Sequence, residues 1–335
     1  MKFVSLNPEN RDKWNLACDN LEDAWFWHRA EWIEYTLAYD PGKRKDLSFM
    51  IEDEGRIVGV CPLIMIETSD HKEFSFGGTN NWSPVCEDSY IRYAYEHTDE
   101  LAKKHGVAVS RMVIKPFSYY NMLTKFGYMD TSISTQVIGF NISLNQNITK
   151  GHLYDIHKGM EKLEIHQSYN IAGYQGMHFK DAGRQTRPDE TFIKQQNWIN
   201  SNHGLLLEAT HNGIPVGYSY TLIYKHYAYY ASACSDPDYA GKNFFIGHVL
   251  NWKAMQMLKS DGINWYETGW QQFGPQLHDF PSKKDQDISK FKRGFGGITV
   301  PLYRGEKYYD RGLFDTTIRS RIDKYQEITF GRKES

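Results

Sequence analysis

Two charged residues late in the chain stand in surroundings that suit acid–base and electrostatic catalysis. Glu267 ends the strand-like run 263–267 and is followed by Thr268, Gly269 and Trp270, which places a carboxylate at a strand end beside a flexible turn. A carboxylate there can act as a base or orient an amine. The alternative is a glutamate that is solvated or paired for structural reasons.

The stretch 287–297 gathers cations, aromatic rings and glycines. It holds Lys290, Lys292 and Arg293 beside two phenylalanines and ends in Gly-Phe-Gly-Gly. A cation held near rings and backbone turns can stabilise an anionic intermediate or bind a phosphate. The alternative is a lysine-rich surface loop that closes a strand. His278, which lies between Glu267 and this stretch, is a further candidate, with an ordinary loop position as its alternative.

A glycine-bearing turn, 235–243, precedes a predicted helix over 245–260. Free backbone amides and the helix dipole at such a point suit a phosphate or a carboxylate. The alternative is plain turn chemistry, which a Gly-Lys pair before a helix also serves. The candidates for binding the phosphates of a cofactor are Gly241, Lys242, Asn243 and Gly247.

Other kinds of site find no support in the sequence. No Gly-x-Ser-x-Gly elbow, Walker loop or dinucleotide fingerprint occurs. The four cysteines lack the spacing of a zinc site or a disulfide framework, so no metal is expected. A net charge of −2 disfavours a general nucleic-acid or anionic-membrane binder. Without a long apolar run or an N-terminal signal pattern, we expect a soluble, cytoplasmic protein with no membrane span.

An internal repeat indicates how these residues are positioned. The segments around Gly55 and Gly59 align with those around Gly213 and Gly217, in each case 158 residues apart. Further on, Gly106 and Gly262 align at a near-equal offset of 156. The chain therefore looks like one αβ unit used twice.

The predicted elements follow the repeat. Hairpins are expected over 47–66 and 204–225, helices over 25–39, 90–105, 153–167, 190–202 and 245–260, and strands over 108–114, 170–175, 226–235 and 263–267. This order predicts an α/β fold with mixed sheets rather than a run of parallel crossovers. Two domains are expected, 1–145 and 146–335, with a ligand cleft between them.

The sequence resembles the Fem-type, tandem GNAT-fold acyltransferases over essentially the whole chain. The resemblance rests on Tyr266-Glu267-Thr268-Gly269, on the stretch 290–297, and on the Asn212-Gly213-Ile-Pro-Val-Gly217 hairpin. It implies two GNAT domains and transfer of an acyl or aminoacyl group from acyl-CoA or aminoacyl-tRNA to an amine. The implied acceptor is an amino-sugar, a nucleotide-linked precursor or a peptide of the cell envelope.

The resemblance also implies roles for residues. Phe291 and Lys292 match the aromatic residue and lysine of the Fem motif, and Glu267 falls where the family usually has an aspartate. Tyr230 is a further catalytic candidate from its strand. Strand ends and loop positions alone, and not the resemblance, predict that an acceptor pocket is walled by Tyr218, Tyr220, Tyr230 and Trp270 of the second unit and approached from the first unit by Asn81, Trp82 and Arg111.

The chain also departs from the Fem pattern. Trp32 is followed by Thr36 instead of a lysine, which weighs against a peptidoglycan-precursor acceptor, and the turn at Gly241 differs from the usual GNAT phosphate loop. A catalytically idle GNAT-like module that binds a glycan or nucleotide-sugar is therefore the alternative function.

Overall fold

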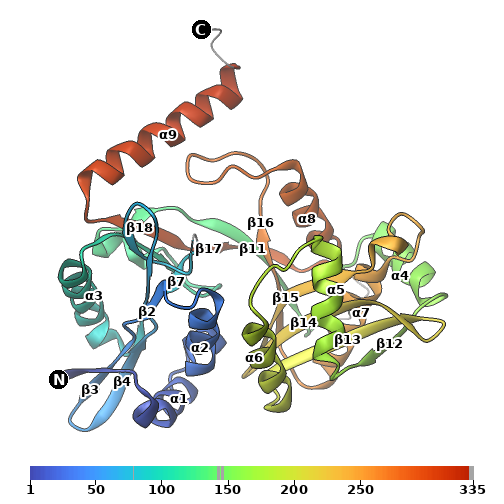
Figure 1. Cartoon of the computed structure of the whole chain (residues 1–335), viewed down its shortest axis with the longest axis horizontal. Helices are drawn as coiled ribbons and strands as arrows, with labels where there is room; N and C mark the ends of the chain where they lie inside the picture. The colour runs from blue at the N-terminus through green and yellow to red at the C-terminus, as the bar shows by residue number, and fades with distance from the viewer. Residues whose placement is uncertain (78, 142–143, 145–146, 332–335) are drawn as a thin grey trace. The chain divides into compact units, whose positions relative to one another are not determined.

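A computed structural model describes residues 1–77, 79–141, 144 and 147–331. It contains two compact units: unit 1 comprises 1–134, 272–286 and 301–335, and unit 2 comprises 135–271 and 287–300 (Figure 1). This division differs from the predicted contiguous one, because the last third of the chain contributes elements to both units. Residues 145 and 146, where the boundary was predicted, lie outside the described residues.

Unit 1 is built on two sheets. One has the strand order β1-β3-β4-β8, and the other has the order β10-β18-β9-β6-β5-β2, with β7 also paired to β9. Short 3-10 turns span Pro8–Asn10, Phe26–His28, Asp88–Tyr90 and Met122–Phe126. The bounds are β1 Lys2–Ser5, α1 Arg11–Asn20, α2 Ala30–Tyr39, β2 Arg44–Asp46, β3 Phe49–Asp53, β4 Arg56–Cys61, β5 Ile64–Glu67, β6 Lys72–Phe74, β7 Asn81–Trp82, β8 Val85–Cys86, α3 Ile91–His105, β9 Val107–Val113, β10 Met129–Asp130, β18 Arg304–Tyr308 and α9 Arg311–Phe330.

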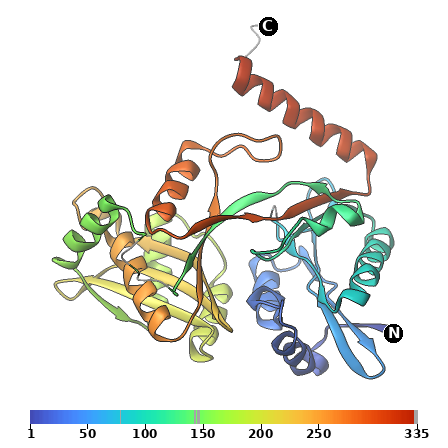
Figure 2. The same cartoon turned by 180° about the vertical axis from the view of Figure 1, so that it is seen from behind.

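Unit 2 is built on one seven-stranded sheet with the order β12-β13-β14-β15-β16-β11-β17. Helices α5 and α6 cover one face, and α7 covers the other (Figure 2). Each of β11, α8 and β17 has residues assigned to both units. The bounds are β11 Ile133–Gly139, α4 Lys150–Met160, β12 Glu164–Gln167, α5 Ile171–Ala182, α6 Asp189–Asn200, β13 Gly204–His211, β14 Ile214–Tyr224, β15 Tyr227–Ser235, α7 Ile246–Ser260, β16 Trp265–Gln271, α8 Lys283–Gly294 and β17 Ile298–Leu302.

The repeat is visible in backbone detail. Both hairpins turn through two residues with positive φ, Glu54-Gly55 in unit 1 and Asn212-Gly213 in unit 2, as a two-residue hairpin requires. The register of β3 on β4 shifts between Ile51 and Glu52. The register of β13 on β14 shifts at the aligned place, between residues 209 and 210. The two hairpins therefore share the same type of turn and a register shift at the same place. The order of strands in the sheets confirms the predicted α/β fold with mixed sheets.

Two predicted elements were wrong. The segment predicted as one helix over 153–167 is α4 followed by strand β12, because residues 164–167 pair with β13. The predicted strand 170–175 is the start of helix α5, where the Asn170 side chain accepts a hydrogen bond from the amide of Gly173 and caps the helix. Lys292 lies in the last turn of α8, so the alternative of a surface loop does not describe this stretch.

The two units differ at one strand edge. In unit 1, β9 pairs in parallel with β6 and then, further along, with β7 through Asn81 and Trp82. In unit 2, β16 pairs in parallel with β15 only from Trp265 to Glu267. Within the described residues no inserted strand continues that side of β16, so its edge beyond Glu267 is not filled as it is in unit 1.

None of the helices in the described part of the chain has the length and apolarity needed to cross a membrane.

Close packing at Gly59 generates a stability prediction. A Cβ at this position would lie 2.3 Å from Cys86 Cβ and 3.2 Å from Cys86 Cα, so Gly59→Ala must push apart two paired strands. We expect a loss of about 1–3 kcal/mol in the free energy of unfolding, measured by urea titration.

Gly176→Ala is the matched control. Gly176 lies inside α5, and an added Cβ would meet nothing within 4 Å. Alanine should therefore stabilise the helix by about 0.5–1 kcal/mol. Equal urea midpoints for the two variants would contradict the packing argument.

Candidate functional site

Glu267 is a buried carboxylate in the middle of the unit 2 sheet. It lies on β16 between β15 and β11, and the residue is only 2% exposed. One carboxylate oxygen accepts a hydrogen bond from Thr135 Oγ1 at 2.5 Å, and the other accepts one from the Tyr227 hydroxyl at 2.9 Å. The two flanking strands thus fix both oxygens.

Lys292 places a cation within electrostatic range of this carboxylate. Burial raises the pKa of Glu267 to about 7, while the hydrogen bonds and the charge of Lys292 act in the opposite direction. Burial lowers the pKa of Lys292 to about 8, against the charge of Glu267. An acid and a base that both titrate near neutral pH are the groups that proton transfer requires.

A glycine makes room for the ammonium. Gly269 has a φ of +96°, and a Cβ built there would lie 3.1 Å from Lys292 Nζ and 3.4 Å from the Tyr229 hydroxyl oxygen. The ends of both side chains therefore lie close to the backbone of β16 at a position two residues beyond Glu267. Any side chain at position 269 would occupy the space that Lys292 uses.

Strands β15 and β16 stop pairing next to the charged side chains of Glu267 and Lys292. The β15–β16 ladder ends at the pair Tyr229–Glu267. Past that point residues 230–233 of β15 are all partly exposed, although the strand is the central one of seven. Unpaired backbone groups on a strand can accept an extended ligand.

The candidates for cofactor phosphates lie at the start of α7. Gly241 and Asn243 both have positive φ, Lys242 is exposed, and no side chain caps the N-terminus of α7. Lys162 donates a hydrogen bond to the carbonyl oxygen of Asn243 at 3.0 Å. The turn thus combines uncapped helix amides with two lysines, as an anion site requires.

The side chain of Phe291, on α8, packs against the N-terminal part of α7. Its ring lies 4.9 Å from the His248 ring on α7, and a Cβ at Gly247 would lie 3.4 Å from its Cζ atom. The structure thus brings the predicted residues Phe291 and Gly247 together, next to Lys292 on α8.

The tyrosines predicted as pocket walls have other surroundings. Tyr218 and Tyr220 are at most 1% exposed, and Tyr220 donates a hydrogen bond to the carbonyl oxygen of Gln195 at 3.0 Å, beneath α5 and α6. Tyr230 packs against the core, and burial raises its pKa to about 12. Trp270, by contrast, is 38% exposed on β16.

The four remaining predicted residues belong to unit 1. Asn81 donates a hydrogen bond to the carbonyl oxygen of Ile64 at 2.9 Å, and Trp82 stacks on Trp27 with ring centroids 5.5 Å apart. Arg111 forms ion pairs with Glu73 and Glu306, at 3.4 and 3.2 Å. His278 Nε2 hydrogen-bonds to the carbonyl oxygen of Ser132 at 2.9 Å. Each has a structural partner within its own unit.

Sequence reasoning missed Thr135, Tyr227 and Tyr229. Tyr227 and Tyr229 alternate on a strand whose aromatic character was recognised, but only the parallel register places Tyr229 beside Glu267. Thr135 lies 132 residues before Glu267 and carried no signal. The described residues contain no group of three or more His, Cys, Asp or Glu side chains suited to a metal ion.

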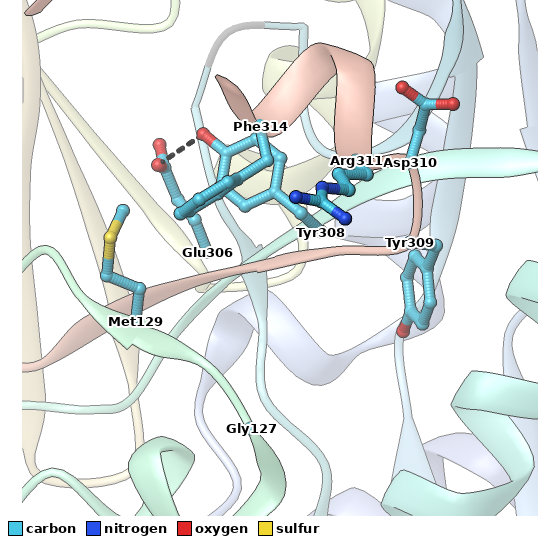
Figure 3. A pocket seen from close by; sticks show the side chains of 8 residues that line it. All are labelled: Gly127, Met129, Glu306, Tyr308, Tyr309, Asp310, Arg311 and Phe314. Atoms are coloured by element: carbon cyan, nitrogen blue, oxygen red, sulfur yellow. Dashed lines mark hydrogen bonds between the residues drawn. The ribbon is translucent and has the colours of Figure 1, made fainter. Parts of the chain in front are cut away.

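A cavity of about 350 Å³ in unit 1 contains none of the predicted residues (Figure 3). It lies at the start of α9, where the Tyr308 hydroxyl donates a hydrogen bond to Glu306 at 2.9 Å. Arg321 also pairs with Glu306 at 2.8 Å, so the carboxylate on this wall is already neutralised. The lining residues are Gly127, Met129, Glu306, Tyr308, Tyr309, Asp310, Arg311 and Phe314.

Comparison with known proteins identifies the fold. A model of the acetyltransferase (GNAT) domain matches residues 194–278, which include β13 to β16 and α7. No curated protein matches the sequence.

Solved structures match over nearly the whole chain. FemX superposes with a TM-score of 0.67 at 9% identity and covers 95% of this chain and 100% of its own. L-PGS from Bacillus licheniformis has a TM-score of 0.64 at 10% identity, covering 98% of each chain. A tandem GNAT protein from the clavulanic acid biosynthesis pathway has a TM-score of 0.55 at 11% identity, covering 92% and 98%. The chain therefore has the tandem GNAT fold of the Fem-like proteins.

Proposed function

We propose that this chain is an N-acyltransferase. It moves an acyl or aminoacyl group from an activated donor, either a thioester or a charged tRNA, to an amine on a cell-envelope sugar or peptide precursor. The observation that carries the proposal is the Glu267–Lys292 pair at the point where β15 and β16 stop pairing. The GNAT-type acyltransferase fold and the FemX and L-PGS neighbours support this class of reaction.

The donor lies along the unfilled edge between β15 and β16, with its phosphates at the start of α7. The partly exposed residues 230–233 and the uncapped helix N-terminus support this placement. Lys242 and Lys162 supply positive charge there. A coenzyme A thioester fits these features, because it joins an extended arm to phosphate groups. The 3′ end of a charged tRNA is the other donor with that combination.

Lys292 and Glu267 take separate roles in the transfer. The amine nitrogen bonds to the donor carbonyl carbon, the bond from that carbon to the donor's sulfur or oxygen breaks, and one proton leaves the nitrogen. The Lys292 ammonium stabilises the negative charge that develops on the carbonyl oxygen. The cost of desolvating this ammonium is met in the folded protein before the substrate arrives, so little reorganisation accompanies the reaction.

Glu267 receives the proton indirectly. At 2% exposure its carboxylate is out of reach of an acceptor amine. Tyr227 already donates to it at 2.9 Å, so the amine proton passes to the Tyr227 oxygen while the Tyr227 proton passes to Glu267. A pKa near 7 suits a carboxylate that gains and returns a proton in each cycle.

One observation favours the alternative of a non-catalytic binding module. Both Glu267 oxygens are already hydrogen-bonded, which is the arrangement of a structural carboxylate. Such a module would bind a glycan or a nucleotide-sugar without turnover.

Lys292→Met tests the catalytic role, because it keeps most of the side-chain length and removes the charge. We expect kcat to fall by about 10²–10³-fold, the usual effect of losing one oxyanion-stabilising group. The measurement is product formation by mass spectrometry, with acetyl-CoA or charged tRNA as donor and a panel of amino-sugars as acceptors.

Lys290→Met is the control, since Lys290 is exposed on the same helix two residues earlier. It should leave kcat within about twofold of the wild type. A folded Lys292→Met variant with wild-type turnover removes Lys292 from the mechanism.

The pH profile tests both groups. Activity needs Glu267 deprotonated and Lys292 protonated, so kcat/KM with one fixed acceptor should rise through pH 7 and fall above pH 8. In Glu267→Gln the acidic limb should disappear and the rate should drop. Retention of the acidic limb in that variant would assign it to another group.

Ligand-induced thermal stabilisation distinguishes the donors from the binding module. A ligand at about 100 times its Kd adds roughly 2.7 kcal/mol of stability. Stabilisation by coenzyme A supports the thioester donor, and binding of charged tRNA that weakens steeply with salt supports the tRNA donor. A response to nucleotide-sugars alone, without turnover, would replace the enzyme by the binding module.

A further inference from the structure

The last turn of α8, which carries Lys292, has every terminal carbonyl capped. Phe295 and Gly296 donate their amides to the carbonyl oxygens of Lys292 and Arg293, at 3.3 and 2.9 Å. The other two carbonyls receive donors from the start of α4, a segment far away in the sequence: Thr149 N–H to Gly294 at 3.0 Å and His152 Nε2 to Phe291 at 2.9 Å. These four acceptors have no partner within the helix itself, so their donors must come from elsewhere.

His152 is seated closely against this turn. Its ring lies 4.8 Å from the Phe295 ring, and a Cβ at Gly294 would fall 2.0–2.4 Å from the imidazole atoms. The ring therefore occupies the space that the missing Gly294 side chain leaves free. Since a carbonyl oxygen only accepts, Nε2 carries the proton, and Nδ1 faces Thr149 Oγ1 at 3.2 Å.

We propose that His152 is a positioning residue for Lys292. It fixes the turn of α8 so that the ammonium stays over Gly269, within range of Glu267. The inference rests on the proposed function, in which that ammonium stabilises the transition state. His152 holds the carbonyl of the residue before Lys292, and Thr149 holds that of the second residue after it, so the lysine backbone is fixed on both sides.

The physical reason is the usual fraying of helix termini. A last turn without capped acceptors samples open conformations, and catalytic groups lose effectiveness when they move by about 1 Å. In an open turn Lys292 would also regain water, and its pKa would return toward the ordinary lysine value of 10.5. The ionisation of Lys292 therefore reports directly on its position.

Three variants separate the hydrogen bond from the bulk of the imidazole. His152→Gln keeps an N–H donor of similar reach, His152→Phe keeps a ring without a donor, and His152→Ala removes both. His157→Ala is the matched control, because His157 is exposed on the same helix.

The first readout does not depend on activity. Amino groups are labelled with acetic anhydride at a series of pH values, and the Lys292 peptide is quantified by mass spectrometry. The labelling midpoint should lie near pH 8 in the wild type, in His152→Gln and in His157→Ala. It should rise by at least one pH unit in His152→Phe and His152→Ala.

The second readout is kinetic. Where turnover is measurable, His152→Phe should lower kcat by roughly tenfold to a hundredfold, as expected for a misplaced catalytic group, with a smaller change in the KM for the donor. His152→Gln should restore most of kcat.

Two outcomes separate this proposal from the proposed function. An unchanged Lys292 midpoint in folded His152→Phe overturns the positioning role, whatever the activity. If the midpoint shifts while Lys292→Met keeps full turnover, the positioning role stands and the catalytic role of Lys292 fails. If His152→Phe and His152→Ala do not fold, His152→Met, which has a reach similar to His152→Gln but no N–H donor, takes their place: a midpoint raised above that of His152→Gln supports the donor role, and a midpoint equal to it overturns that role.

Discussion

The enclosure of one carboxylate and one ammonium in unit 2 is the constraint on which the rest of the site depends. Burying charge is costly unless neighbouring groups compensate, and Glu267 has a hydroxyl on each oxygen. The compensation is incomplete, so the pKa values of Glu267 and Lys292 move toward each other, to about 7 and about 8. Groups kept solely for stability would be better replaced by apolar side chains, which favours a functional reason for the pair.

The duplicated framework is used differently in its two copies. At the repeat offset of 156 residues that aligns Gly106 with Gly262, Arg111 on β9 aligns with Glu267 on β16. Arg111 is paired with Glu73 and Glu306, and β7 occupies the strand edge beside it. The corresponding edge in unit 2 stays unfilled beyond Glu267. The same hairpin, helix and strand thus give a closed arrangement in one unit and an open one in the other.

The sequence allowed local features to be predicted better than distant contacts. The turns at Gly55 and Gly213 follow from residue chemistry within a few positions, and their hairpins formed as predicted. Glu267 and Lys292 were recognisable because glycines and a strand end surround them. The partners of Glu267 were not, since Thr135 reaches it only through the order of strands in the sheet. Aromatic alternation likewise could not show that the face of β14 bearing Tyr218 and Tyr220 is covered by α5 and α6.

The place of β18 has a consequence for biosynthesis. This strand, Arg304–Tyr308, lies between β10 and β9 in the interior of a unit 1 sheet, although strands β11 to β16 separate it from both of them in the sequence. While the ribosome is still translating, the emerging N-terminal segment has a gap in that sheet, and the facing edges of β9 and β10 lack their partner. Unit 1 therefore completes this hydrogen-bonded ladder only after the residues of unit 2 have been synthesised, and until then two strand edges of its sheet remain open to other pairing.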